Sequence, residues 1–190
     1  MMNVRLIIFL AVALVQISVP ASMIWKRQRT MREGRLWKFR TAPVDPVDVL
    51  RGRYLVLRFG AEAFPRPTPW LTDTMEALPY GRTTYVSLKE DANGFAMVDE
   101  ISKAPHKDDN TVRAENLGHY EGTQRVKFPF DRLWVTEASA PAAEKAYAEH
   151  SGREKVDAYV TVRVFRGDAA IDELYIAGQP LRDYLRAHPP

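Results

Sequence analysis

The chain contains no cysteine among its 190 residues. Disulfide bonds, thiolate zinc sites, iron–sulfur clusters and cysteine nucleophiles are therefore excluded. The sequence also lacks the glycine-rich phosphate-binding motifs and the G-x-S-x-G nucleophile elbow, so it predicts neither a nucleotide site nor an α/β-hydrolase active site. Its four histidines are far apart and lack the spacing that puts two ligands on one helix face. We expect no cofactor and no metal.

Positive charge is concentrated near the N-terminus. Eight of the 27 basic residues lie in residues 1–40, together with one of the 24 acidic residues, so residues 41–190 carry a net charge of −4. Nucleic-acid binding needs several cations on one surface to displace counterions. We therefore expect no nucleic acid among the partners.

One long hydrophobic run is present, because residues 6–25 contain no charged side chain. A helix of that length covers about 30 Å, the thickness of the hydrocarbon core of a bilayer. The run also has features of a secretory signal, with a possible cleavage point after Ala21. We favour an uncleaved transmembrane anchor over a cleaved signal peptide or a soluble core helix, and we expect the lipid bilayer to be a partner.

The side of the membrane on which the remaining chain lies is left open by two conflicting signals. The basic run over residues 26–40 resists translocation and is typical of the cytoplasmic or headgroup side. Trp25 before it and Trp37 near its end suit a segment that lies at the membrane interface. The short leader before the apolar run is typical of a signal anchor, and it favours the extracytoplasmic side. The expected organisation is an anchor at 1–25, a basic juxtamembrane segment at 26–40 and a globular domain at 41–190.

The globular part is predicted to be rich in strands. Short runs of β-branched and aromatic residues alternate with proline and glycine. The predicted strands are Tyr54–Phe59, Thr83–Leu88, Gly94–Val98, Arg125–Phe130, Leu133–Thr136, Ala158–Arg166 and Ile171–Ile176. The last two form a hairpin with its turn at Gly167-Asp168, which makes the Arg-Gly-Asp tripeptide there a turn with flanking charges rather than an adhesion motif.

One helix is predicted between a Ser139 N-cap and Gly152, with Ala143, Ala146 and Tyr147 on its buried face. A second short helix is predicted over Leu181–Ala187, and residues 103–110 are predicted to be an exposed loop. The expected fold is mainly β (α+β): an N-terminal transmembrane helix followed by a β-rich, sandwich-like or barrel-like domain with one or two short helices.

A family resemblance spans most of the chain. The run from Pro43 to Phe59, PVDPVDVLRGRYLVLRF, resembles the signature of the bacterial GDYXXLXY family, and residues 128–135, 140–144 and 174–180 resemble later segments of that family. The resemblance implies a single-pass protein of the bacterial inner membrane whose function is uncharacterised. Arg53 replaces the aspartate of the signature, and Phe59 replaces its final tyrosine. The motif residues, structural or binding, are Asp45, Pro46, Asp48, Gly52, Arg53, Tyr54, Leu57 and Phe59.

The signature itself favours architecture over a binding site, since apolar residues on both faces are typical of a covered strand. Asp45 and Asp48 flank Pro46 and are more simply explained as caps of a proline turn than as an acid–base pair. A second, weaker likeness is to type I signal peptidases, carried by the anchor, the strand after Gly52 and the closing Leu174–Pro180 segment. The place of their nucleophile falls at Val44, which has no reactive oxygen, so the likeness implies the scaffold without the peptidase.

Three functions stay open. We favour a non-catalytic, membrane-anchored interaction or accessory domain, whose partner would be a polytopic membrane protein. The alternatives are a cryptic hydrolase or peptidase that uses Ser87, Ser139 or His119, and a small-ligand domain in which exposed aromatics line a cleft, namely Trp70, Tyr80 and Trp134.

Overall fold

The computed structural model describes residues 4–43, 54–65, 79–105, 110–152 and 155–188. The described elements are α1 (Val4–Glu33), β1 (Arg35–Arg40), β2 (Tyr54–Val56), the 3₁₀ helix η2 (Gly60–Glu62), β3 (Ala63–Pro65), β4 (Thr83–Glu90), β5 (Ala96–Ser102), β6 (Thr111–Tyr120), β7 (Thr123–Lys127), β8 (Arg132–Trp134), α2 (Ala140–His150), β9 (Tyr159–Phe165), β10 (Asp168–Ile176), β11 (Gln179–Pro180) and α3 (Leu181–Ala187). Strands predominate, which confirms the mainly β, α+β prediction.

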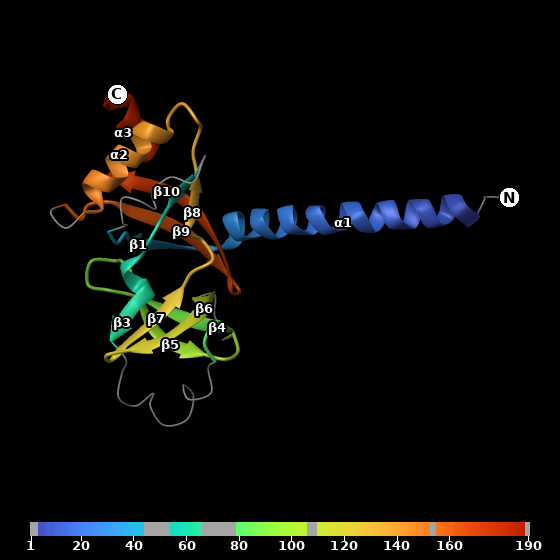
Figure 1. The fold of residues 1–190 in the computed structure, drawn as a ribbon, viewed down its shortest axis with the longest axis horizontal. Helices are drawn as coiled ribbons and strands as arrows, with labels where there is room; N and C mark the ends of the chain where they lie inside the picture. The colour runs from blue at the N-terminus through green and yellow to red at the C-terminus, as the bar shows by residue number, and fades with distance from the viewer. Residues whose placement is uncertain (1–3, 44–53, 66–78, 106–109, 153–154, 189–190) are drawn as a thin grey trace.

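The strands form three antiparallel sheets. Their orders are β1-β9-β10-β11, β2-β8 and β3-β7-β6-β4-β5. In Figure 1 the four-stranded sheet lies with α2 and α3 at one end of the body, and the five-stranded sheet lies at the other end. A parallel bridge from Val112 to Gly167 joins β6 to the β9–β10 turn, and a bridge from Thr41 to Phe59 joins the chain after β1 to the chain after β2. The two ends are thereby connected directly by backbone pairing.

One hydrophobic core runs through the body and connects the sheets. At its centre four phenylalanine rings pack with centroids 5.1 to 6.3 Å apart, mostly edge to face: Phe39, Phe59, Phe128 and Phe130. Such aromatic pairs contribute about 0.5–1.5 kcal/mol beyond the burial of their area. Phe39 comes from β1, Phe59 follows β2, and the other two lie between β7 and β8, so the cluster joins segments that are far apart in sequence.

Helix α1 projects away from the body (Figure 1). Its 30 residues continue through Pro20 and correspond to about 45 Å. The hydroxyls of Ser18 and Ser22 donate to the carbonyls of Val15 and Val19, so these polar groups are satisfied within the helix. The part from Ile7 to Glu33 is long and apolar enough to be a membrane anchor or a signal sequence.

The basic segment expected at 26–40 divides between two elements. Residues up to Glu33 continue α1, and Arg35–Arg40 forms β1, which pairs with β9 along its whole length. The interpretation of Trp37 as a residue at the lipid surface is wrong, because its side chain is 2% exposed. The period-two pattern explains the difference: Trp37 and Phe39 face the core, while Lys38 and Arg40 face outward.

The predicted C-terminal hairpin is confirmed with a shifted turn. Phe165 pairs with Asp168, so Arg166 and Gly167 are the two turn residues, and both have positive φ. This geometry is that of a type I′ turn, whose twist matches the twist of the strands. The Arg-Gly-Asp tripeptide lies at this turn, where the Gly167 carbonyl accepts a hydrogen bond from the Arg113 N–H.

Helix α2 has the predicted buried face, with Ala143, Ala146 and Tyr147 in the core. The predicted capping role of Ser139 is wrong in its chemistry: Ser139 occupies the N-cap position, but its hydroxyl donates to the carbonyl of Thr136 and makes no cap hydrogen bond. Strand β6 was not predicted. Its sequence, TVRAENLGHY, includes charged and amide side chains and Gly118, so apolar and polar residues do not alternate clearly along it.

Candidate functional site

The last turns of α1 pack against the β9–β10 hairpin rather than ending at its surface. Thr30 is 3% exposed. The guanidinium of Arg29 lies 4.9 Å from the ring centroid of Phe165 on β9 and forms a 2.9 Å ion pair with Glu33 on its own helix. The Gly34 N–H donates to the Thr30 carbonyl at 3.0 Å, and the chain turns directly into β1. We call this contact region the joint: Arg29, Thr30, Gly34, Arg163 and Phe165.

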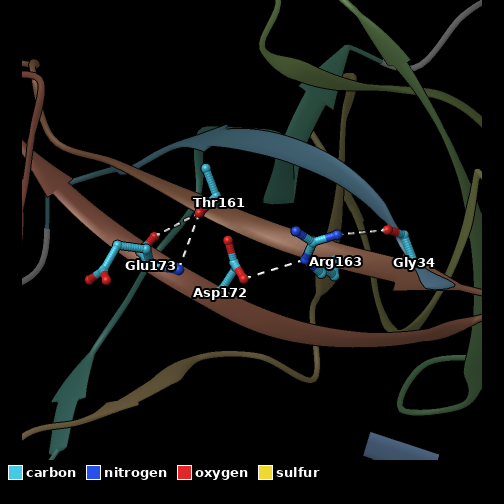
Figure 2. Close-up of polar contacts among 5 residues, drawn as sticks. All are labelled: Gly34, Thr161, Arg163, Asp172 and Glu173. Atoms are coloured by element: carbon cyan, nitrogen blue, oxygen red, sulfur yellow. Dashed lines mark hydrogen bonds and ion pairs between the residues drawn. The ribbon is translucent and has the colours of Figure 1, made fainter. Parts of the chain in front are cut away.

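Arg163 ties the joint to a bulge in β10 (Figure 2). Its Nη1 donates to the Gly34 carbonyl at 3.3 Å, and its Nε donates to Asp172 at 3.4 Å. Asp172 is the residue skipped by the register between Ile171 and Glu173. On the same strands, the Thr161 hydroxyl accepts from the Glu173 N–H and donates to the Glu173 carbonyl, so the bulge leaves these polar groups satisfied.

A second feature is a groove beside the joint. Three cavities of about 210, 310 and 290 Å³ meet at Pro129, and we call them together the Pro129 groove. Its walls come from the end of α1, the start of β10, strand β6 and the segment that leads into β8. Five cationic side chains and three acidic ones line it: Lys26, Arg27, Arg113, Lys127 and Arg132, with Glu115, Asp131 and Asp168.

The charges in the Pro129 groove are partly paired. Arg113 lies 3.6 Å from Asp168, and Arg132 lies 3.7 Å from Asp131. These pairs are exposed, so each contributes little to stability. Lys26 and Arg27 form no ion pair with another residue of the described part of the chain. The groove therefore has an excess of positive charge and can accept an anion.

A third feature is a cleft of about 420 Å³ between η2–β3 and β5, which we call the β5 cleft. Strands β3 and β5 are the two edges of the five-stranded sheet. Both edges line the cleft, with Phe64 and Met97 among its apolar residues and Lys89 and Asp99 paired at 2.7 Å. Met97 is 41% exposed. An accessible edge strand beside apolar side chains can pair with an extended peptide.

The signature residues fall into two groups. Asp45, Pro46, Asp48, Gly52 and Arg53 lie outside the described residues. Tyr54, Leu57 and Phe59 are described, and they do not form a polar site. Leu57 and Phe59 are buried in the core, and the Leu57 N–H donates to the Asp131 carbonyl at 2.8 Å. The half-buried Tyr54 ring meets the Trp134 ring edge to face at 5.3 Å.

The candidate catalytic residues are not brought together. Ser87 is on β4, exposed His119 is on β6, and Ser139 bonds Thr136 in front of α2. Within the described ranges no hydrogen bond joins either serine to a histidine or a carboxylate. Of the three aromatics proposed to line a cleft, Trp134 borders the Pro129 groove, Tyr80 is exposed elsewhere, and Trp70 lies outside the described residues.

One histidine cluster was missed from the sequence. His150 Nδ1 lies 2.6 Å from Asp157 Oδ1, and its Nε2 lies 3.1 Å from the Tyr184 hydroxyl. The His150 carbonyl also accepts from the N–H groups of Asp157 and Ala158. The three residues join the end of α2, the approach to β9 and helix α3. No spacing rule signals such a cluster, because its members come from three separate segments.

A half-buried carboxylate lies beside the aromatic cluster. Glu62 accepts hydrogen bonds from the N–H groups of Phe59 and Phe128, at 3.2 and 3.3 Å. Burial raises the pKa of this carboxyl above its usual value, although the two N–H groups and Arg58 oppose the shift. Glu62 thus fixes the backbone of two core segments at an electrostatic cost.

The comparisons with known proteins give one match. The family model described as GDYXXLXY protein matches residues 16–174. No curated protein and no solved structure matches the chain. The match covers the joint, the Pro129 groove, the β5 cleft and most of the body. It gives no support to the likeness to signal peptidases.

Proposed function

The chain belongs to the GDYXXLXY protein family, and on that basis we propose that it is a single-pass, membrane-anchored and non-catalytic domain that serves a membrane protein as an interaction or accessory module. Helix α1 is the uncleaved anchor, and the β-rich body lies at the membrane surface. The protein resides in the bacterial inner membrane.

The joint is the observation that carries this proposal. A body attached by a flexible linker would sample many orientations, whereas α1 runs without interruption from its apolar part into contacts with β9 and β10. Arg163 adds a hydrogen bond to the Gly34 carbonyl, where the helix passes into β1. A rigid connection fixes the orientation of the body, so that the same faces are turned toward neighbours in the same membrane.

The β5 cleft is the surface that we assign to the protein partner. It offers the edge of β5 and the exposed side chain of Met97, and edge strands pair readily with an extended segment of another chain. The occupant would be an extended loop or terminal segment of a membrane protein.

The proposal is tested in two steps on the full-length protein at native expression. Alkaline carbonate washing of membranes should leave the intact polypeptide in the pellet. A photoreactive amino acid at position 97 should then cross-link a membrane protein, while the same group at exposed Lys145 on α2 should not. Release by carbonate, or loss of residues before Lys26 from the mature protein, would contradict the anchor. Labelling by a serine-reactive probe that a single Ser→Ala change abolishes would contradict the non-catalytic assignment.

A further inference from the structure

We propose that the Pro129 groove binds the phosphate headgroup of an anionic phospholipid and thereby seats the body on the bilayer. This inference rests on the proposed function, because it requires α1 to lie in a membrane. It assigns a ligand to a surface that the anchor alone would leave without a role.

The position of the groove is the first argument. Trp25 is exposed on α1, one residue before the cationic end of the helix, and tryptophan is enriched at membrane–water interfaces. Lys26 and Arg27 follow immediately, and both line the groove. From Trp25 to Thr30, where the helix is buried against the body, the helix advances by about 8 Å. Because Lys26 and Arg27 line it, the groove opens beside the end of α1, at the depth that the lipid headgroups would have.

The charge of the groove is the second argument. Its cations come from four separate elements: Lys26 and Arg27 from α1, Arg113 from β6, Lys127 from β7 and Arg132 from β8. A phosphodiester accepts several charge-assisted hydrogen bonds at once, and arginine donates them with fixed geometry. The carboxylates of Asp168 and Asp131 hold Arg113 and Arg132 in place at 3.6 and 3.7 Å but leave Lys26 and Arg27 for the ligand.

The rim of the groove is the third argument. The Trp134 side chain is 67% exposed at the edge of the groove, and its ring packs edge to face against that of Tyr54. An exposed indole with an apolar body and one N–H donor is suited to the boundary between acyl chains and headgroups. Arg132 lies over the ring of Tyr54 with its guanidinium carbon 5.1 Å from the centroid, which places cation and aromatic rings side by side.

The test measures lipid retention by the full-length protein in detergent micelles, using native mass spectrometry with phosphatidylglycerol or phosphatidylcholine added. The groove variant is Arg27→Gln with Arg113→Gln, and the matched control is Lys145→Gln with Arg182→Gln on α2 and α3. We expect the wild type to retain phosphatidylglycerol in preference to phosphatidylcholine. Because each cation near an anionic surface contributes about 1 kcal/mol, the groove variant should lose about fivefold in this preference per charge removed. The control should lose nothing.

Several results would overturn the inference. One is that the wild type retains phosphatidylglycerol and phosphatidylcholine equally. Another is that the groove variant and the control lose the preference for phosphatidylglycerol to the same extent. Tight binding of inorganic phosphate alone would assign the groove to a soluble anion. Carbonate washing of the same variants keeps the two proposals distinct. If both variants stay in the membrane pellet while the lipid preference is unaffected, the groove assignment fails and the anchor stands; if the wild type is washed off, the anchor itself fails.

Discussion

Gly34 approaches Thr30 so closely that a Cβ atom built on Gly34 would lie 2.3 Å from the Thr30 carbonyl oxygen. The same atom would lie 3.1 Å from the carbonyl of Val164. Both obstacles are backbone atoms, which cannot rotate away. Only glycine allows the chain to leave the helix and enter β1 within one residue, so the short joint depends on this side chain being absent.

The first prediction concerns that contact. Gly34→Ala should lower the free energy of unfolding by about 1–3 kcal/mol, since the new methyl group must displace the end of α1 from β9. Denaturant titration of the full-length protein in detergent measures the change. Gly60→Ala is the matched control, because nothing lies within 4 Å of its added Cβ, and it should be nearly neutral. Equal effects of the two substitutions would show that the close approach at Gly34 does not constrain the joint.

The second prediction concerns the rigidity of the joint. Arg163→Ala removes the hydrogen bond to Gly34 and the contact with Asp172, and it should lower the free energy of unfolding by about 1–2 kcal/mol. Arg186→Ala removes an exposed pair with Asp183 on α3 and should cost less than about 0.5 kcal/mol.

The absence of cysteine makes the motion itself measurable. Spin labels at Gln28→Cys on α1 and Lys145→Cys on α2 report the orientation of the helix relative to the body. The distance distribution should be narrow in the wild type and in Arg186→Ala, and broad in Arg163→Ala. A broad distribution in the wild type would contradict a rigid connection.

These side chains also show how far the sequence could predict the structure. The hairpin of β9 and β10 was predictable because Val160, Val162 and Val164 alternate with polar residues. The joint was not, since the same basic residues that indicate a juxtamembrane segment also form the outer face of β1. Whether Trp37 faces lipid or core depends on β9, which lies more than a hundred residues away in sequence.

The surfaces were less predictable than the fold. The Pro129 groove collects Arg27, Arg113 and Arg132 from three elements that only the tertiary structure brings together. Trp134 was identified as an exposed aromatic, but its neighbours were not. Leu57 and Phe59 of the signature proved to be core residues, as their apolar alternation indicated. Local patterns thus predict burial well, and they predict the assembly of a site poorly.

The third prediction contrasts two tyrosines. The Tyr147 hydroxyl is fully buried near the Arg58 backbone, Ser151 and Thr41, but it makes no hydrogen bond of good geometry within the described part of the chain. Burial raises its pKa to about 12, although these three neighbours oppose the shift. Tyr147→Phe should therefore leave stability unchanged or raise it by up to about 1 kcal/mol, because an unsatisfied polar group is removed. Tyr184→Phe deletes the hydrogen bond to His150 and should cost about 1 kcal/mol. Thermal unfolding should show a loss of stability for Tyr184→Phe and none for Tyr147→Phe. A loss for Tyr147→Phe would imply a hydrogen-bond partner for its hydroxyl.

The fourth prediction concerns pH and Glu62. Burial raises the pKa of this carboxyl in the folded protein above the ordinary value of 4.5, so the folded state binds the proton more tightly than the unfolded chain does. The stabilising contribution is complete below about pH 4.5 and is lost as the pH rises through the raised pKa. Glu62→Gln cannot titrate, and its glutamine carbonyl still accepts from one of the two N–H groups. As the pH rises through this window, the wild type should therefore lose stability relative to Glu62→Gln. Glu149→Gln, at an exposed position of α2, is the control, and its free energy of unfolding should change with pH as that of the wild type does. If the free energy of unfolding of Glu62→Gln also changes in parallel with that of the wild type, the Glu62 carboxylate keeps its solvation in the folded protein.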